Sequence, residues 1–108
     1  MVKATVAKRR TAARTKTVPY DVAEQLRTSE EMAAYLDAWL DEAPDDAAGI
    51  SRAIGEIARA RGMSQVARDA GLSRESLYKA LGENGNPSFA TVLKVVRALG
   101  VKFHAEPA

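Results

Sequence analysis

The 108-residue chain contains no cysteine and one histidine, and aromatic residues make up only 6% of it. The absence of cysteine excludes a disulfide framework, thiolate zinc sites and cysteine catalysis, and it fits a reducing cytoplasm. A single histidine cannot build a multi-histidine metal site, and Ser73 and Ser76 have no base partner for nucleophilic chemistry. No apolar run approaches the roughly 18 residues that span a bilayer. We therefore expect a cytoplasmic protein without catalytic residues, metal, cofactor or membrane segment.

Charge is distributed unevenly along the chain. The formal net charge is only +2, but residues 1–17 carry +6, residues 18–48 carry −8 and residues 49–108 carry +4. Such a sharp division indicates that the protein meets more than one kind of partner.

Residues 1–18 lack helical or strand periodicity and predict a flexible, disordered basic arm, which is either a solvated tail or an additional source of attraction to phosphates. Residues 19–44 predict an acidic amphipathic helical segment. Thr28 and Glu31 have the spacing of a capping box at a helix start, and Pro44 ends the helix. The apolar side chains between them recur at helical spacing; they are Met32, Tyr35, Leu36, Trp39, Leu40 and Ala43.

Residues 45–100 predict a bundle of short helices. Asp45 or Asp46 can cap a helix that runs to about Arg61, and Ser64, Ser73 and Ser88 can cap the three that follow. The last helix ends at Gly100 and has an expected inner face of Phe89, Val92, Leu93, Val96 and Leu99. The tail, residues 101–108, alternates apolar and polar at 101–105 and predicts a short strand, which needs a partner: a symmetry mate, the N-terminal segment or another protein. The fold class is therefore all-α, with about five helices and a short C-terminal β-strand.

Residues 64–81 read SQVARDAGLSRESLYKAL and predict two short helices joined by a sharp turn at Gly71. This is the spacing of a DNA-binding helix-turn-helix, although an αα-hairpin in an ordinary bundle remains the alternative. Arg74 could bond a guanine and Glu75 could accept from a cytosine amino group, if the second helix entered a major groove. The expected DNA-binding residues are Ser64, Gln65, Ser73, Arg74, Glu75, Ser76, Tyr78 and Lys79.

Residues 46–100 resemble the Xre/Cro-type helix-turn-helix domain. The stretch RARGMSQVARDAGLSRESLYKALGENGNPSFATVLKVVRALG is similar to the HigA-like addiction-module antidote proteins, and the resemblance extends over roughly residues 19–107. It implies an antitoxin that neutralises a RelE/ParE-like (HigB-type) toxin and represses its own operon by binding operator DNA. In a bacterial cytoplasm such a protein would be associated with the nucleoid when it is bound to the operator.

The toxins of this family are typically small and basic, so the acidic segment is the expected toxin-binding surface. Its candidate contacts are Tyr35, Leu36, Trp39 and Leu40, unless these side chains pack on the protein's own core. A homodimer is expected, because helix-turn-helix proteins read paired half-sites. The alternatives are a stand-alone Xre-type repressor without a toxin, and an interaction module that does not bind DNA.

Overall fold

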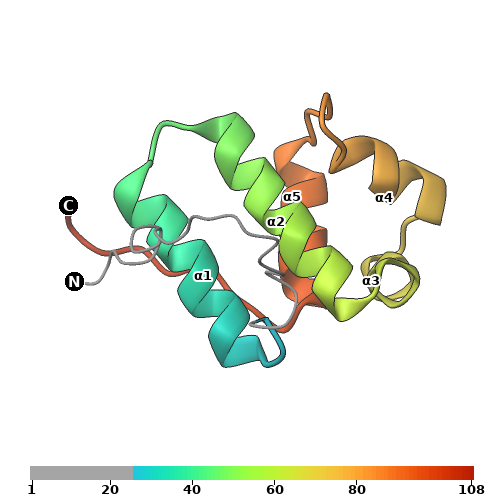
Figure 1. Ribbon diagram of the computed structural model, residues 1–108, viewed down its shortest axis with the longest axis horizontal. Helices are drawn as coiled ribbons and strands as arrows, with labels where there is room; N and C mark the ends of the chain where they lie inside the picture. Colours follow the sequence, from blue (N-terminus) through green and yellow to red (C-terminus); the bar gives the residue numbers. More distant parts are fainter. Residues whose placement is uncertain (1–25) are drawn as a thin grey trace, which may run out of the picture.

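The computed structural model describes residues 26–108 and contains five α-helices in that range (Figure 1). They are α1 (Ser29–Glu42), α2 (Ala47–Arg61), α3 (Met63–Ala70), α4 (Arg74–Ala80) and α5 (Phe89–Ala98). The predicted all-α class is confirmed, and the arrangement is compatible with a helix-turn-helix bundle. The expected basic arm, residues 1–18, lies outside the described residues.

The first helix begins at the predicted capping box. The Glu31 N–H donates to Thr28 Oγ1 over 3.1 Å, and Glu31 Oε1 accepts from the backbone N–H groups of Arg27 (2.8 Å) and Thr28 (3.1 Å). The hydrogen bond from Arg27, aided by that from Thr28, holds the pKa of the Glu31 carboxyl below its usual range. The local sequence therefore fixes where α1 starts, because free N–H groups at a helix start are satisfied by side chains.

Three of the four other expected caps are confirmed. The side chains of Asp46, Ser73 and Ser88 each accept from the backbone N–H three residues later, at the starts of α2, α4 and α5. The prediction that Ser64 caps the third helix is wrong. Gly62, with φ 113°, lets the chain turn directly from α2 into α3, so Ser64 already lies within the first turn of α3.

Helices α1 and α2 lie side by side, α5 lies behind α2 in the view of Figure 1, and α3 and α4 form the far end of the molecule. A single core runs between these helices. It consists of the buried side chains of Leu26, Met32, Leu36, Ile54, Ile57, Ala58, Met63, Val66, Ala67, Leu77, Leu81, Val95, Val96 and Leu99.

Hydrogen bonds join the C-terminal end of α5 to the start of α1 and to the end of α2. The Leu99 carbonyl oxygen accepts from Ser29 Oγ (3.5 Å) and from an Arg61 guanidinium nitrogen (3.3 Å). The N–H groups of Gly100 and Val101 donate to the carbonyls of Arg97 and Val96, which is the hydrogen-bond pattern of a Schellman ending. The predicted stop at Gly100 is confirmed.

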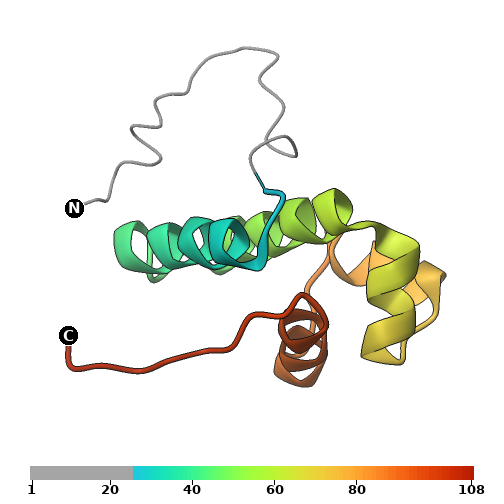
Figure 2. The ribbon, with the colours of Figure 1, turned by 90° about the horizontal axis from the view of Figure 1, so that it is seen from below.

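The predicted C-terminal strand is absent. Residues 101–108 leave the end of α5 as an extended chain on the side of α1 (Figure 2), and none of residues 26–108 forms a strand. An extended segment needs a second strand edge to complete its backbone hydrogen bonds. No other extended segment of the described chain offers such an edge.

The expected inner face of α5 is also corrected. Val92, Val96 and Leu99 face the core as predicted, but Phe89 and Leu93 are 70% and 44% exposed, and Val95 is buried in their place. The helix carries apolar side chains around more than half of its circumference, so periodicity alone could not choose between the two faces.

Candidate nucleic-acid and partner interfaces

Helices α3 and α4 are the two short helices predicted for residues 64–81, and a tight turn with Gly71 in the left-handed conformation joins them, which is compatible with a helix-turn-helix. Gly71 adopts φ 73° and ψ 31°, a conformation that glycine takes at no steric cost. The Leu72 N–H donates to the Ala67 carbonyl over 2.9 Å, which closes the end of α3. Val66 and Leu77 are fully buried on the facing sides of the two helices. The turn therefore leaves one face of α4 free of internal packing.

That face carries the polar residues that the sequence indicated. Ser73, Arg74, Glu75, Ser76, Tyr78 and Lys79 are all exposed, and none of them belongs to the core. Ser73 Oγ accepts from the Ser76 N–H (3.0 Å) and donates to Ser76 Oγ (2.8 Å). The hydroxyls of Ser73 and Ser76 are therefore already hydrogen-bonded to each other at the start of α4. Backbone N–H groups that remain free at a helix start can bind a phosphate.

Arg74 and Tyr78 form a pair one helical turn apart. The Arg74 guanidinium lies 5.2 Å from the centroid of the Tyr78 ring and donates a hydrogen bond to its hydroxyl oxygen over 3.3 Å. The guanidinium therefore lies over the face of the Tyr78 ring, as in a cation–π contact. The sequence indicated both residues separately, but not their contact.

On α3, the two sequence candidates differ. Ser64 is exposed, whereas both ends of the Gln65 amide are occupied: Nε2 donates to Asp69 Oδ1 (2.9 Å), and Oε1 accepts from Arg68 (3.0 Å). Arg68 adds an exposed cation to the face that Gln65 occupies, and sequence reasoning did not select it. Its position three residues after Gln65 was the available signal, because such residues share a helix face.

The four residues expected to contact a toxin are placed differently on α1. Leu36 is only 3% exposed and belongs to the core. Tyr35 and Trp39 are half-buried against α2, where the Tyr35 hydroxyl donates to Glu56 Oε1 over 2.5 Å. Leu40 is 36% exposed and presents an apolar side chain among acidic ones.

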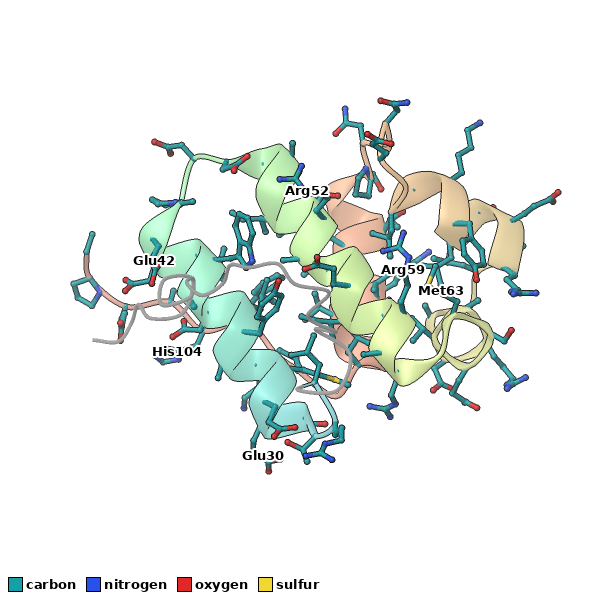
Figure 3. The ribbon with its side chains drawn as sticks, in the orientation of Figure 1. Glu30, Glu42, Arg52, Arg59, Met63 and His104 are labelled. Carbon is teal, nitrogen blue, oxygen red and sulfur yellow. The ribbon has the colours of Figure 1, made fainter. Side chains whose placement is uncertain are left out.

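The outer side of α1 is strongly acidic. Glu30 and Glu42 lie at its two ends (Figure 3), and Asp37 and Asp41 are exposed between them. The last turn of α1 contains no basic residue to balance the partial negative charge of the helix end. This surface is therefore attractive to a positively charged partner.

Two kinds of site are not formed by the described part of the chain. Among residues 26–108, no group of three or more histidine or carboxylate side chains could hold a metal ion. No helix in this range is both long and apolar enough to cross a membrane.

The chain is similar to proteins of one family. A family model described as "Probable addiction module antidote protein" matches residues 16–107. A protein of Haemophilus influenzae, strain Rd, described as "Uncharacterized protein", is 55% identical over 87 residues, which cover 81% of this chain and 88% of that protein. No solved structure matches the chain. The chain therefore belongs to the family of probable addiction module antidote proteins, which implies the antitoxin role and a toxin partner.

Proposed function

We propose that this antitoxin neutralises a RelE/ParE-like (HigB-type) toxin through α1 and represses its own operon by binding operator DNA as a homodimer. The observation that carries the DNA-binding part is the polar face of α4. The polar side chains of α4, the helix that follows the tight turn at Gly71, are exposed and lie outside the core. They are therefore free to contact a DNA major groove.

The exposed side chains of α4 suit direct reading of bases. Arg74 has the planar fork that bonds guanine O6 and N7, and Glu75 can accept from a cytosine amino group. Lys79 and Arg68 add positive charge for phosphate contacts on either side. An αα-hairpin without a nucleic-acid partner would not require this concentration of donors on one exposed face.

The acidic surface of α1 supports the toxin-binding part. Glu30, Asp37 and Glu42 offer negative charge to a basic toxin, and opposite charges accelerate association and fix its orientation. Leu40 and the exposed parts of Tyr35 and Trp39 supply apolar anchors among these charges. Leu36 contributes indirectly, because its buried side chain holds α1 on the core.

Co-expression with the product of the neighbouring gene tests the toxin part. The expected result is co-purification of the two proteins and rescue of growth in cells that express the neighbour. Retardation of the DNA upstream of the gene tests the operator part, and its affinity should fall steeply with salt. DNA binding without a toxin partner would instead support a stand-alone Xre-type repressor. A protein that captures the toxin but never binds this DNA would leave only the interaction role.

A further inference from the structure

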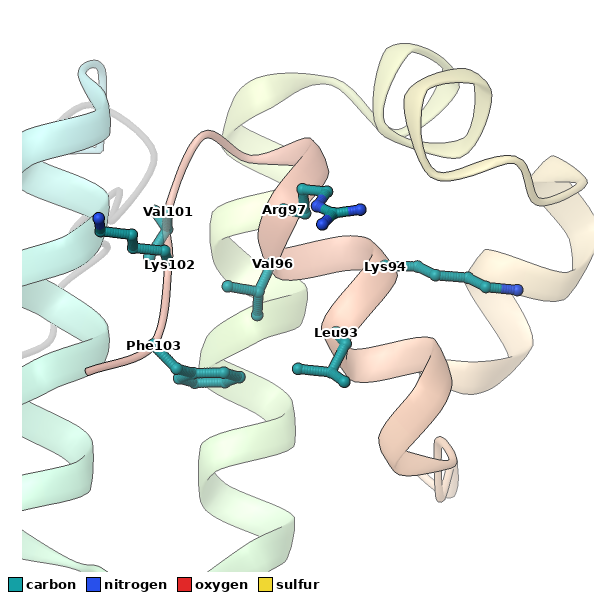
Figure 4. Close-up of a pocket in the computed structure, with 7 residues that line it drawn as sticks. All are labelled: Leu93, Lys94, Val96, Arg97, Val101, Lys102 and Phe103. Carbon is teal, nitrogen blue, oxygen red and sulfur yellow. The ribbon is translucent and has the colours of Figure 1, made fainter. Parts of the chain in front are cut away.

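A groove between α5 and the tail has an apolar lining. Its volume is about 320 Å³, and its apolar residues are Leu93, Val96, Val101 and Phe103. Leu93, Val96 and Phe103 point toward one another from the two sides of the groove (Figure 4). Leu93 and Phe103 are exposed, and so is Phe89, one helical turn before Leu93. Three of the five exposed large apolar side chains of the described chain therefore gather here, which indicates a binding surface.

Cations flank this groove on both sides. Lys94 and Arg97 extend to one side of α5, and Lys102 extends from the tail to the opposite side (Figure 4). None of the described residues that line the groove is acidic. A segment that lies on the groove therefore meets positive charge at both edges, which favours an acidic occupant.

The tail beside the groove offers a free backbone edge. The N–H of Val101 donates to the Val96 carbonyl, but residues 102–108 make no backbone hydrogen bond with another part of the described chain. Phe103 points into the groove and Lys102 points away from it (Figure 4), which is the alternation of a β-strand. A second extended segment can pair with such an edge and place every other side chain over the groove.

Charge separates the candidate occupants of the groove. A second copy of this chain would bring the same three cations to it, and residues 1–17 carry +6 and no acidic residue. The proposed toxin is basic and would be repelled in the same way. A phosphate backbone could pair with the cations, but it has no apolar group to place between Leu93 and Phe103. An acidic segment with apolar side chains complements both the rim and the lining.

We propose that the groove binds an extended, acidic segment of a partner protein other than the toxin, and that this segment adds a strand to residues 101–105. Alternate side chains of the segment are apolar and pack between Leu93 and Phe103. The remaining side chains include carboxylates, one of which lies opposite Lys102 in the strand pair, where opposite charges attract. The groove is thus an interaction surface separate from the α4 face and from α1.

Fluorescence anisotropy of the full chain with a labelled synthetic peptide tests the proposal. The probe is a peptide of about seven residues, blocked at both ends, in which glutamates alternate with two valines and a central phenylalanine. Its dissociation constant should rise by about ten-fold between about 50 mM and about 500 mM NaCl, because salt screens exposed charges. A peptide with lysines in place of the glutamates should bind at least about ten-fold more weakly. So should a peptide of the same composition with its glutamates grouped at one end, because it lacks the alternation.

Two substitutions separate the apolar and the charged parts of the groove. Leu93→Asp should weaken binding of the acidic peptide by about ten-fold or more at each salt concentration, because it places a carboxylate in the apolar lining. Lys102→Glu should weaken that binding mainly at low salt and should strengthen binding of the lysine peptide. Leu40→Asp on α1 and Arg52→Glu on α2 are the matched controls, since both sites are exposed and lie on other helices. Both controls should keep the wild-type affinity, and circular dichroism checks that each variant remains folded.

Hydrogen exchange reports whether the bound peptide pairs as a strand. Backbone amides of residues 102–105 that face the peptide should exchange at least about ten-fold more slowly in the complex. Binding of the peptide without this protection would contradict strand addition and overturn the proposal.

Other results would assign the groove differently. Equal affinity for the glutamate and lysine peptides, no binding of either, or binding that survives both Leu93→Asp and Lys102→Glu would overturn the proposal. A dimer in sedimentation equilibrium that Leu93→Asp abolishes and the acidic peptide does not dissociate would place a second copy in the groove. Tighter binding of a peptide of residues 18–25, which contain Asp21 and Glu24 and no base, would place the chain's own segment there. These measurements involve neither DNA nor toxin, so the proposed function can fail while this proposal stands.

Discussion

The guanidinium of Arg74 lies over the ring of Tyr78 and donates a hydrogen bond to its hydroxyl oxygen. Both side chains are exposed on α4, one helical turn apart. A stacked guanidinium has less conformational freedom to lose when it binds a planar acceptor, so in the proposed complex with operator DNA the ring would favour bidentate contact of Arg74 with a guanine. Residues four positions apart on a helix are neighbours, so this local contact bears directly on the proposed recognition of DNA by Arg74.

Arg74→Ala should weaken binding to the cognate operator by roughly 1–3 kcal/mol, with a much smaller effect on random DNA. The reason is that a bidentate base contact carries sequence information, whereas a phosphate contact does not. Titrations of both DNAs at one salt concentration measure the difference. Arg52→Ala removes an exposed cation from α2, outside the proposed DNA-binding helices α3 and α4, and is the matched control. Equal losses on both DNAs would show that Arg74 contacts phosphate alone.

Tyr78→Phe and Tyr78→Ala separate the two parts of the Arg74 contact. Phenylalanine keeps the ring beneath the guanidinium and loses only the exposed hydrogen bond, so its affinity for the operator should stay close to that of the wild type. Alanine removes the ring as well and should cost about 0.5–1 kcal/mol, the size of an exposed cation–π contact. In an Arg74→Ala background the alanine change should cost less. An undiminished cost there would mean that Tyr78 contacts DNA independently of Arg74.

Helix ends were predictable from the sequence because their causes are local. The capping box of Thr28 and Glu31 and the caps at Ser73 and Ser88 need only residues three positions apart. The prediction that Ser64 caps α3 was wrong because the chain already turns at Gly62. In the sequence alone, a serine within a helix cannot be distinguished from a serine at its start.

Which face of an amphipathic helix packs on the core was harder to predict, because it depends on residues that are distant in the sequence. Phe89 and Leu93 share helical spacing with Val92 and Val96, and only the packing of α3 against α5 turns Val95 inward instead. The exposed positions of α4 were predicted more fully, since polar residues on a short helix with one apolar side can only face the solvent. That Trp39 packs on the protein's own core was one of the two alternatives that the sequence left open, but its position over Gly49 was not predictable, because it depends on the space that this glycine leaves on α2.

Glu42→Lys should separate the stability of the fold from the binding of the toxin. The substitution places a cation at the C-terminal end of α1, where it should stabilise the fold by about 0.3–1 kcal/mol through the helix dipole. It also removes negative charge from the proposed toxin surface, so association with a basic toxin should slow, most clearly at low salt. Thermal unfolding and stopped-flow association measure the two effects. Faster association in the variant would contradict the proposed role of the acidic surface.

The capping box predicts a dependence of stability on pH. The pKa of Glu31 is lower in the folded chain than is usual for a glutamate, because its carboxylate accepts backbone hydrogen bonds. A group with a lowered pKa stabilises the fold above its unfolded pKa, and this contribution is lost as the pH falls through the folded value. The wild type should therefore lose more stability than Glu31→Gln on acidification below the ordinary glutamate range. Denaturant unfolding across that range measures the difference, and parallel losses in the two proteins would contradict the assignment.

Gly49→Ala should destabilise the protein, although alanine is ordinarily the better helix former by about 1 kcal/mol. A Cβ at Gly49 would lie 2.5 Å from Trp39 Cζ3 and would also collide with the carboxylate of Asp46, which caps α2. Relief of these clashes must move the indole or break the cap, and overpacking of this kind typically costs about 1–3 kcal/mol. Denaturant unfolding of the variant measures the cost. Trp39→Leu should reduce it by removing the larger obstacle, so the double variant should lose less than the two single losses combined. A Gly49→Ala protein that is more stable than the wild type would show that Trp39 does not pack over this position.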